Sequence, residues 1–163
     1  MEWQQYQVAD FSKLRLYVSQ LKDEILIGKR KWKPPDIHLV YTSLIKSYLK
    51  LEEIMSYIGS SSLLQPDIDD QNAWISFCLN GEEKIEPTLN TLFCFNQSDV
   101  EQVLEYLVQF VETERKVEYK IGQWIYTLLV ILEQPLQPDT CSCLRSLARA
   151  CSVIRADIVI FII

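Results

Sequence analysis

The chain has 163 residues, of which 48% are hydrophobic and 23% charged, with only 4 glycines and 6 prolines. This apolar fraction is too high for an intrinsically disordered protein, and the length is sufficient for one domain with its own hydrophobic core. The formal net charge of −6 argues against a protein that wraps nucleic acid over its whole surface, and a single histidine leaves little room for general-base or zinc chemistry.

The N-terminal segment, residues 3–27, is predicted to form one long helix. It contains no glycine or proline, and its apolar residues recur every three or four positions, as on one face of a helix. This stripe consists of Val8, Phe11, Leu14, Val18, Leu21 and Ile25. Gly28, a residue type that commonly ends helices, marks the predicted end.

A basic run, Lys29–Lys33, follows the first helix and ends at a proline pair that forbids helix. The apolar spacing then predicts a second helix over residues 37–58, and glycine and serine predict a flexible loop near residues 59–66. The basic run includes Trp32, and a cationic loop with an aromatic residue could contact RNA phosphates and stack a base. RNA binding through Lys29–Lys33 is therefore the alternative function for this chain.

A short third helix is predicted over the segment that carries Trp74, Phe77 and Cys78. The aspartates of Asp67–Asp70 can cap its first turn, because a carboxylate accepts from the unpaired backbone N–H groups there. Gly81 is the predicted stop of this helix.

A capped helix is predicted to follow from residue 98. Ser98 and Glu101 match the capping box, in which a hydroxyl and a carboxylate each satisfy an unpaired backbone N–H. The helix is predicted to break near Arg115. Its apolar face consists of Val100, Val103, Leu104, Leu107 and Val111.

The segment Val117–Glu133 is predicted to form the central helix. It is apolar on several sides, which is typical of a helix surrounded by its neighbours. Trp124 and Leu128 are therefore predicted to lie in the core. Pro135 and Pro138 are predicted to form a rigid turn after it.

A last helix is predicted from the cap residues Asp139 or Thr140. Its apolar face consists of Leu144, Leu147, Ala148, Cys151 and Ile154. The apolar tail Ile158–Ile163 is far shorter than the roughly 20 residues that span a bilayer, and we expect a groove of the chain or a second copy to cover it. The chain is thus predicted to be all-α, a single compact domain over residues 1–163 with about five to seven helices.

Neither the cysteines nor the histidine form a recognisable catalytic or metal-binding pattern. Structural zinc sites usually combine paired Cys-x2–4-Cys elements, whereas here Cys141 and Cys143 are separated by one residue and only Cys151 lies near. We expect these thiols to be free and at least partly buried. His38 lacks a nucleophile motif around it. No catalytic residue, metal or cofactor is predicted, and a small thiol-dependent enzyme is kept as a third hypothesis.

Several stretches resemble, in the same order, the landmarks of a known family. They are Trp3-Gln4-Gln5-x-Gln7-Val8-Ala9-x-Phe11-Ser12, Trp74-x-x-Phe77-Cys78-Leu79, Val103-Leu104-Glu105-Tyr106-Leu107, Gly122-x-Trp124-x-Tyr126-x-Leu128-Leu129, Leu132-Glu133-x-Pro135-Leu136-x-Pro138 and Leu144-Arg145-x-Leu147-Ala148-Arg149-x-Cys151-Ser152. Together they cover most of residues 3–155 and resemble the survival-of-motor-neuron (SMN) interacting protein family, the second Gemin of the SMN complex. Residues 28–66 match this family poorly.

This resemblance implies a helical, non-catalytic adaptor of the SMN complex, which assembles Sm-protein rings on small nuclear RNAs before mRNA splicing. The implied partners are the amphipathic N-terminal helix of SMN, Sm proteins and other subunits of the SMN complex, with self-association left open. RNA is expected to be contacted only indirectly, and no membrane is expected. The implied locations are the cytoplasm and nuclear bodies of the nucleus.

We expect the SMN helix to lie against the first long helix and the helix that contains residues 122–129. An all-α domain with surplus apolar helix surface can hold a partner helix in a groove. The expected contact residues are Phe11, Leu14, Leu16, Tyr17, Leu21, Gly122, Gln123, Tyr126 and Leu129. The resemblance implies a basic residue where this chain has Gln123, so a charge pair with an acidic SMN residue would be lost here. Alternatively, these residues fill the core of the domain itself.

Overall fold

The computed structural model describes residues 2–31, 66–80, 87, 91, 93 and 95–160, with the side chains of residues 80 and 158–160 excepted. These parts of the chain contain five α-helices and no strand, so the predicted all-α fold is confirmed. The predicted helix over residues 37–58, the predicted loop near residues 59–66 and His38 lie outside the described residues.

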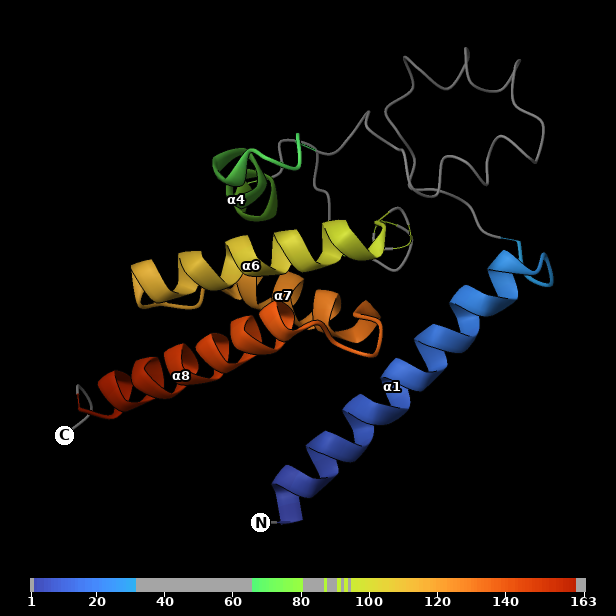
Figure 1. Cartoon of the computed structure of the whole chain (residues 1–163). Helices are drawn as coiled ribbons and strands as arrows, with labels where there is room; N and C mark the ends of the chain where they lie inside the picture. Colours follow the sequence, from blue (N-terminus) through green and yellow to red (C-terminus); the bar gives the residue numbers. More distant parts are fainter. Residues whose placement is uncertain are drawn as a thin grey trace.

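The described helices form a bundle around α6, with α1 attached at one side (Figure 1). Their bounds are α1 Glu2–Leu26, α4 Gln71–Asn80, α6 Gln97–Glu114, α7 Tyr119–Ile131 and α8 Pro138–Ile160. Helix α6 packs against α4, α7 and α8, and α4 also reaches α7. Helix α1 packs against α7 alone among these helices.

The core lies where α4, α6 and α7 meet. One whole face of α6 is buried, as the apolar spacing predicted, and its residues Val103, Leu104 and Leu107 are inaccessible to solvent. Trp124 and Leu128 of α7 are also buried, which confirms their prediction as core residues. Aromatic rings fill the space between α4 and α7 in edge and stacked arrangements, which are the favourable geometries for such rings. Their centroids are 5.6 Å apart for Trp74–Phe95 and 6.4 Å apart for Phe95–Trp124.

The cap of α6 lies two residues earlier than predicted. Asn96, and not Ser98, is the N-cap: its side-chain oxygen accepts from the backbone N–H of Asp99, and the Asp99 carboxylate accepts from the backbone N–H of Asn96. The sequence allowed this error because asparagine caps as well as serine does, and aspartate can take the place of the usual glutamate. The predicted break at Arg115 is confirmed, since this residue has φ 50° and ends the helix.

Helix α8 corrects two further predictions. It begins at Pro138, which suits a first helical position because proline has no N–H to leave unpaired there, so Asp139 and Thr140 lie within the helix instead of capping it. Its predicted apolar face is rotated, because Ala148 and Cys151 are exposed. The residues that pack on the core from this helix are Cys143, Leu144, Leu147, Ala150 and Ile154. The backbone is helical to Ile160, whereas the side chains from residue 158 onward are outside the described part.

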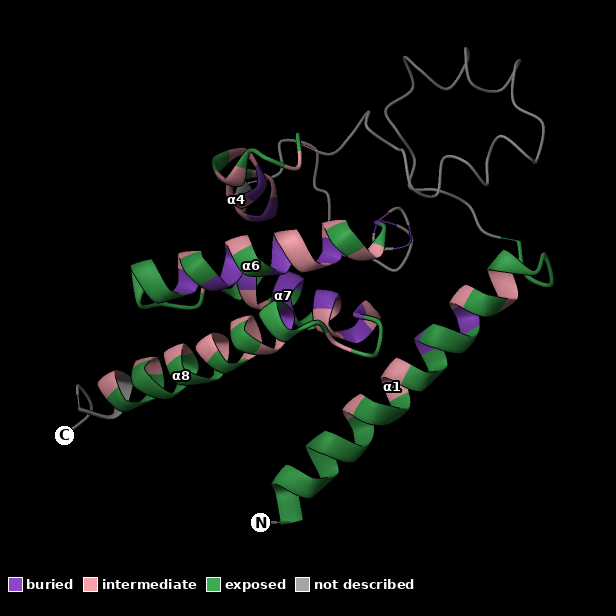
Figure 2. Ribbon diagram, viewed as in Figure 1, coloured by how far each residue is buried: buried purple, intermediate pink, exposed green. Residues whose placement is uncertain are grey.

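Helix α1 confirms the predicted long helix but buries only part of its stripe. Val18 and Leu21 are buried against Val130 of α7 and Phe93, with Phe11, Leu14 and Ile25 half-buried beside them. Val8 lies on the predicted apolar stripe of the helix but is 66% exposed. Its exposure follows from the arrangement of the bundle, because the N-terminal half of α1 extends beyond α7 (Figure 2).

Candidate functional site

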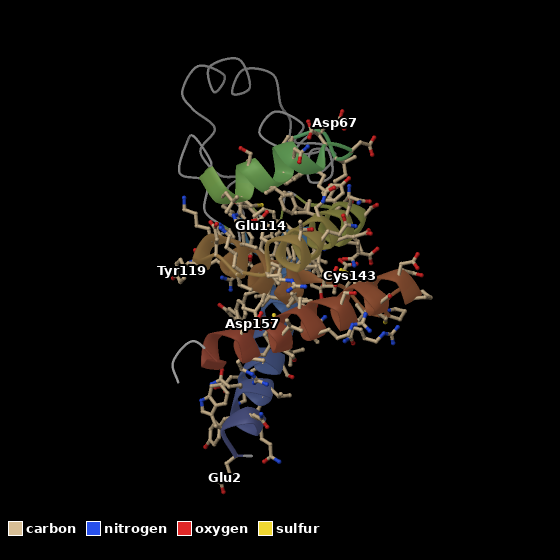
Figure 3. All side chains as sticks on the ribbon, turned by 90° about the vertical axis from the view of Figure 1, so that its left-hand side faces the viewer. Glu2, Asp67, Glu114, Tyr119, Cys143 and Asp157 are labelled. Carbon is tan, nitrogen blue, oxygen red and sulfur yellow. The ribbon has the colours of Figure 1, made fainter. Side chains whose placement is uncertain are left out.

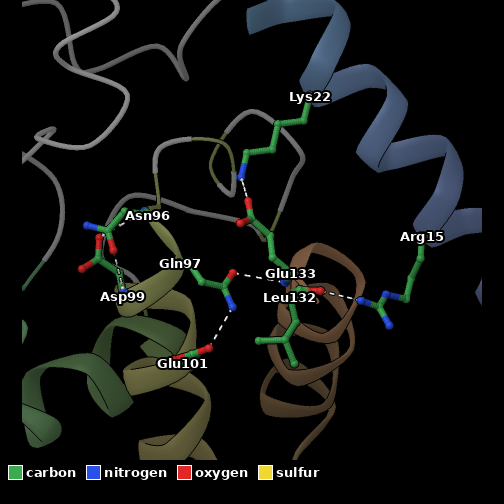
Figure 4. Close-up of polar contacts among 8 residues, drawn as sticks. All are labelled: Arg15, Lys22, Asn96, Gln97, Asp99, Glu101, Leu132 and Glu133. Carbon is green, nitrogen blue, oxygen red and sulfur yellow. Dashed lines mark hydrogen bonds and ion pairs between the residues drawn. The ribbon is translucent and has the colours of Figure 1, made fainter. Parts of the chain in front are cut away.

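Helix α1 is attached to the C-terminal end of α7 by polar contacts (Figure 4). Arg15 Nη2 donates a hydrogen bond to the carbonyl oxygen of Leu132, and Lys22 forms an ion pair with Glu133. Both cations therefore lie at the end of α7 where the helix dipole is negative and carbonyl groups lack partners within the helix. From the other side, Gln97 Oε1 of α6 accepts from the backbone N–H of Glu133 at 3.1 Å.

The part of α1 up to Tyr17 and the exposed side of α7 form the candidate site, which we call the α1–α7 surface and define by Phe11, Tyr17, Gln123 and Tyr126. The rings of Phe11 and Tyr126 meet edge to face, with centroids 5.5 Å apart. No Cα atom of α1 lies within 8 Å of one in α8, among the residues described. Beyond the Phe11–Tyr126 contact, α1 thus diverges from the bundle (Figure 1).

The predicted contact residues divide into packed and exposed ones. Leu21 is buried and Leu14 is half-buried between α1 and α7, while Leu129 is half-buried against the main core. By contrast Leu16 and Tyr17 are 62% and 54% exposed. Because successive residues of a helix are about 100° apart, these two side chains point to different sides of α1.

The other three predicted contact residues of α7 are Gly122, Gln123 and Tyr126, which lie on its outer side. Tyr126 is 49% exposed. Gln123 is exposed and donates through Nε2 to the hydroxyl oxygen of Tyr119 at 3.2 Å. Gly122 is half-buried, and a Cβ added there would lie 3.4 Å from Val117 Cγ1, at ordinary van der Waals distance.

A groove of about 630 Å³ runs beside the α1–α7 contact, on the side of α1 that carries Leu16. Leu16 and Leu26 line it from α1, and Val130 and Ile131 line it from α7. Arg15 and Lys22 border it where they bind the end of α7. The predicted contact residues include Leu16 but not Leu26. The sequence signal for Leu26 was that it is a large apolar residue outside the packed stripe of the helix.

Sequence reasoning also missed the exposed aromatic residues at the start of α1. Trp3 and Tyr6 are each 72% exposed. Neither belongs to the predicted stripe of apolar residues that recur every three or four positions. Large exposed apolar side chains gathered on one helix commonly mark an interaction surface. Their signal in the sequence was aromatic content at positions where a soluble helix usually carries polar residues.

The described cysteines are all free, as predicted: Cys78, Cys141, Cys143 and Cys151. Burial raises the pKa of Cys78 to about 12. Burial, with the carboxylates of Glu105 and Glu112, raises the pKa of Cys143 to about 11. Cys151 is exposed, contrary to the expectation that it is partly buried. A nucleophilic thiol requires a lowered pKa, so Cys78 and Cys143 have the opposite character.

Two further searches cover the described residues. No cluster of three or more histidine, cysteine, aspartate or glutamate side chains in this part of the chain could hold a metal ion. None of the described helices is both long and apolar enough to cross a membrane.

Comparison with known proteins gives consistent results. The chain is 30% identical to Gem-associated protein 2 of Xenopus laevis, over 97% of this chain and 58% of that protein. It is 28% identical to the Mus musculus protein of the same name, over 95% of this chain and 54% of that protein. The chain thus spans a little over half the length of these relatives.

A solved structure and a family model extend this likeness. A chain of the structure titled "The 8S snRNP Assembly Intermediate" superposes with a TM-score of 0.63 at 27% sequence identity, over 92% of this chain and 56% of that one. The model of the family described as Survival motor neuron (SMN) interacting protein 1 (SIP1) matches residues 1–161. Because this match covers nearly the whole chain, the protein belongs to the Survival motor neuron (SMN) interacting protein 1 family.

Proposed function

We propose that this chain is a non-catalytic adaptor in SMN-dependent assembly of small nuclear ribonucleoproteins. It binds an amphipathic SMN helix and contacts Sm proteins, working with other SMN-complex subunits in the cytoplasm and in nuclear bodies. Residues 1–163 act as one SMN-binding domain. Family membership and the likeness to an assembly intermediate support this role.

The observation that carries the proposal is the α1–α7 surface. Phe11 and Tyr126 meet at its edge, Tyr17 is exposed on α1, and N-terminal to Phe11 the helix leaves the bundle with Trp3 and Tyr6 exposed. An amphipathic partner helix can lie in this angle and cover apolar surface that the chain leaves open. The buried Leu21 and the half-buried Leu14 and Leu129 then serve the binding site by holding the two helices in place.

The test is the affinity of the purified chain for a peptide that corresponds to the SMN helix, measured by calorimetry. Tyr126→Ala is expected to weaken binding by about tenfold or more, since an aromatic residue that a partner buries can contribute about 2 kcal/mol. Because Tyr126 is half exposed, the melting temperature is expected to change little. Val153→Ala, which truncates an equally exposed apolar residue on α8, away from α1, is the matched control. Binding that is equal in both variants would contradict the proposed surface.

Gln123 gives a second, independent test of the same site. We expect Gln123→Lys to strengthen binding of an SMN helix that carries an acidic residue opposite this position, and to do so only at low salt. No effect at low salt would show that position 123 lies outside the interface.

RNA binding through Lys29–Lys33 remains the alternative. In the described part of this run, Lys29 and Lys31 are exposed while Arg30 forms an ion pair with Glu24 at 2.9 Å. RNA affinity that falls steeply with salt, and that is lost with Lys29→Ala and Lys31→Ala but kept with Tyr126→Ala, would favour this function.

A further inference from the structure

We propose that the groove between α4 and α6 receives a basic, amphipathic helical segment of a protein partner. This groove lies on a different part of the bundle from the α1–α7 surface and shares no residue with it. The inference therefore does not depend on the function proposed above.

The groove is held open by two contacts that fix α4 on α6. Tyr106 donates its hydroxyl to the carbonyl oxygen of Ile68 at 3.0 Å, and Gln71 Nε2 donates to Gln109 Oε1 at 3.1 Å. The volume between the helices is about 640 Å³. The half-buried side chains of Ile75, Leu79 and Phe110 line it, so it offers apolar surface to an inserted side chain.

The charged side chains on α4 and α6 are all acidic, while Arg115 and Lys116 follow α6 at its C-terminal end. Helices α4 and α6 contain no lysine or arginine, and neither does the described segment that leads into α4. The carboxylates around the groove are Asp67, Asp69, Asp70, Glu105, Glu112 and Glu114, of which Asp67 and Glu114 are labelled in Figure 3. None of them forms an ion pair with a described residue.

Glu105 and Glu112 give the acidic side a defined spacing. They lie on the same side of α6 seven residues apart, which corresponds to about 10 Å along the helix. Gln109, which borders the groove, donates to Glu105 Oε1 at 3.1 Å and so links this carboxylate to the groove. Both glutamates are exposed and lie beside the groove, not in its lining.

The apolar lining of the groove and the carboxylates beside it together indicate the chemistry of the partner. The phosphates of a nucleic acid or of an anionic membrane would be repelled by the carboxylates of α6 and of the segment before α4. A helix with leucine-like side chains on one face fits the apolar lining, and cations seven residues apart on its flank can reach both glutamates. The partner is therefore a basic segment of another protein.

The experiment uses the full chain and a fluorescent amphipathic helical peptide, with leucine on one face and arginine along its flank. Glu105→Gln with Glu112→Gln is expected to weaken binding about three- to tenfold, the loss of two exposed ion pairs. Glu2→Gln with Asp10→Asn, which changes the charge equally on α1, is the control and should change it less than about twofold. Ser76→Trp, at an exposed position that lines the groove, should abolish binding by filling it.

Three outcomes would overturn the proposal. One is equal binding of the peptide in which glutamate replaces every arginine. Another is equal weakening by the α6 and α1 double variants, which would mean attraction by net charge alone. The third is amide shifts in nuclear magnetic resonance spectra that map to α1 and α7 instead of α4 and α6. Shifts confined to α4 and α6, and lost with Ser76→Trp, support the groove.

Discussion

Helices α6 and α1 have similar apolar spacing but different surroundings. Six apolar residues of α6 are buried, from Val100 to Val111. The longer α1 buries only Val18 and Leu21. The difference arises from the number of neighbours, since α6 packs against α4, α7 and α8, whereas α1 meets only α7 among the described helices. Helices α4, α6, α7 and α8 thus form the packed bundle, and α1 is attached to this bundle only through α7 among the described helices.

Helix α7 shows the same contrast between a buried side and an exposed side. On α7, Trp124 is 1% exposed and joins the core, whereas Tyr126, two residues later, is 49% exposed and meets Phe11 of α1. The two side chains lie about 200° apart around the helix axis. Helix α7 therefore serves the core on one side and the α1–α7 surface on the other.

The largest expected effect comes from the core side of α7. Trp124→Ala should lower the free energy of unfolding by about 3 to 5 kcal/mol, because it leaves a cavity beneath α4 and removes the stacked contact with Phe95. Urea unfolding measures this loss, and Tyr126→Ala in the same assay should lose less than about 1 kcal/mol. Similar losses in both variants would contradict the division of α7 into a core side and a binding side.

The attachment of α1 is expected to give a smaller and more local effect. Arg15→Ala removes a charged donor from the carbonyl of Leu132, which should cost about 1.5 kcal/mol. Hydrogen exchange should show faster opening of α1, while amides of α6 remain protected. Lys13→Ala is the control, since Lys13 only pairs with Asp10 on the surface, at 3.8 Å. Equal exchange in α1 of both variants would show that Arg15 does not hold the helix.

Much of the fold could be predicted because periodicity depends on local sequence. The stripes of α6 and α7 place Val103, Leu107 and Leu128 in the core correctly. Val8 lies on the predicted stripe of α1 but is exposed, because a stripe does not reveal where the neighbouring helix ends. Cys151 was misplaced because α8 packs against α6 alone among the described helices, so that several rotations of its apolar residues agree equally well with the sequence.

The candidate site was less predictable because its contacts join distant residues. The sequence suggested that α1 and α7 share a surface, and the structure brings Phe11 and Tyr126 together. The contact between Arg15 and Leu132 spans 117 positions, and no local pattern indicates such a pair. The groove between α4 and α6 also requires two separate helices, which no pattern within one helix indicates.

The buried thiol of α4 provides a prediction on pH. The pKa of Cys78 is raised from 9.0 to about 12 in the folded chain, so above pH 9 the unfolded chain binds fewer protons than the folded one. The contribution of Cys78 to stability is therefore complete below pH 9 and declines as pH rises toward 12. Between pH 8 and 10 the parent should lose about 1.4 kcal/mol more than Cys78→Ala does, measured by urea unfolding. Parallel losses would mean that this thiol ionises equally in both states.

The cap of α6 gives the smallest expected effect and tests how this helix begins. Asn96→Ala should cost about 1 kcal/mol, because the Asp99 backbone N–H then loses its acceptor at the start of the best-buried helix. Ser98→Ala removes the residue that the sequence favoured as the cap, and it should change stability by only a few tenths of a kcal/mol because Ser98 lies inside α6 and is exposed. Thermal unfolding of the two variants under one set of conditions compares them directly. A larger loss from Ser98→Ala would return the cap to residue 98 and shorten α6 at its N-terminal end. Because the backbone N–H of Glu133 donates to the side-chain oxygen of Gln97, the first residue of α6, a shortened helix would also loosen the end of α7 on which α1 rests.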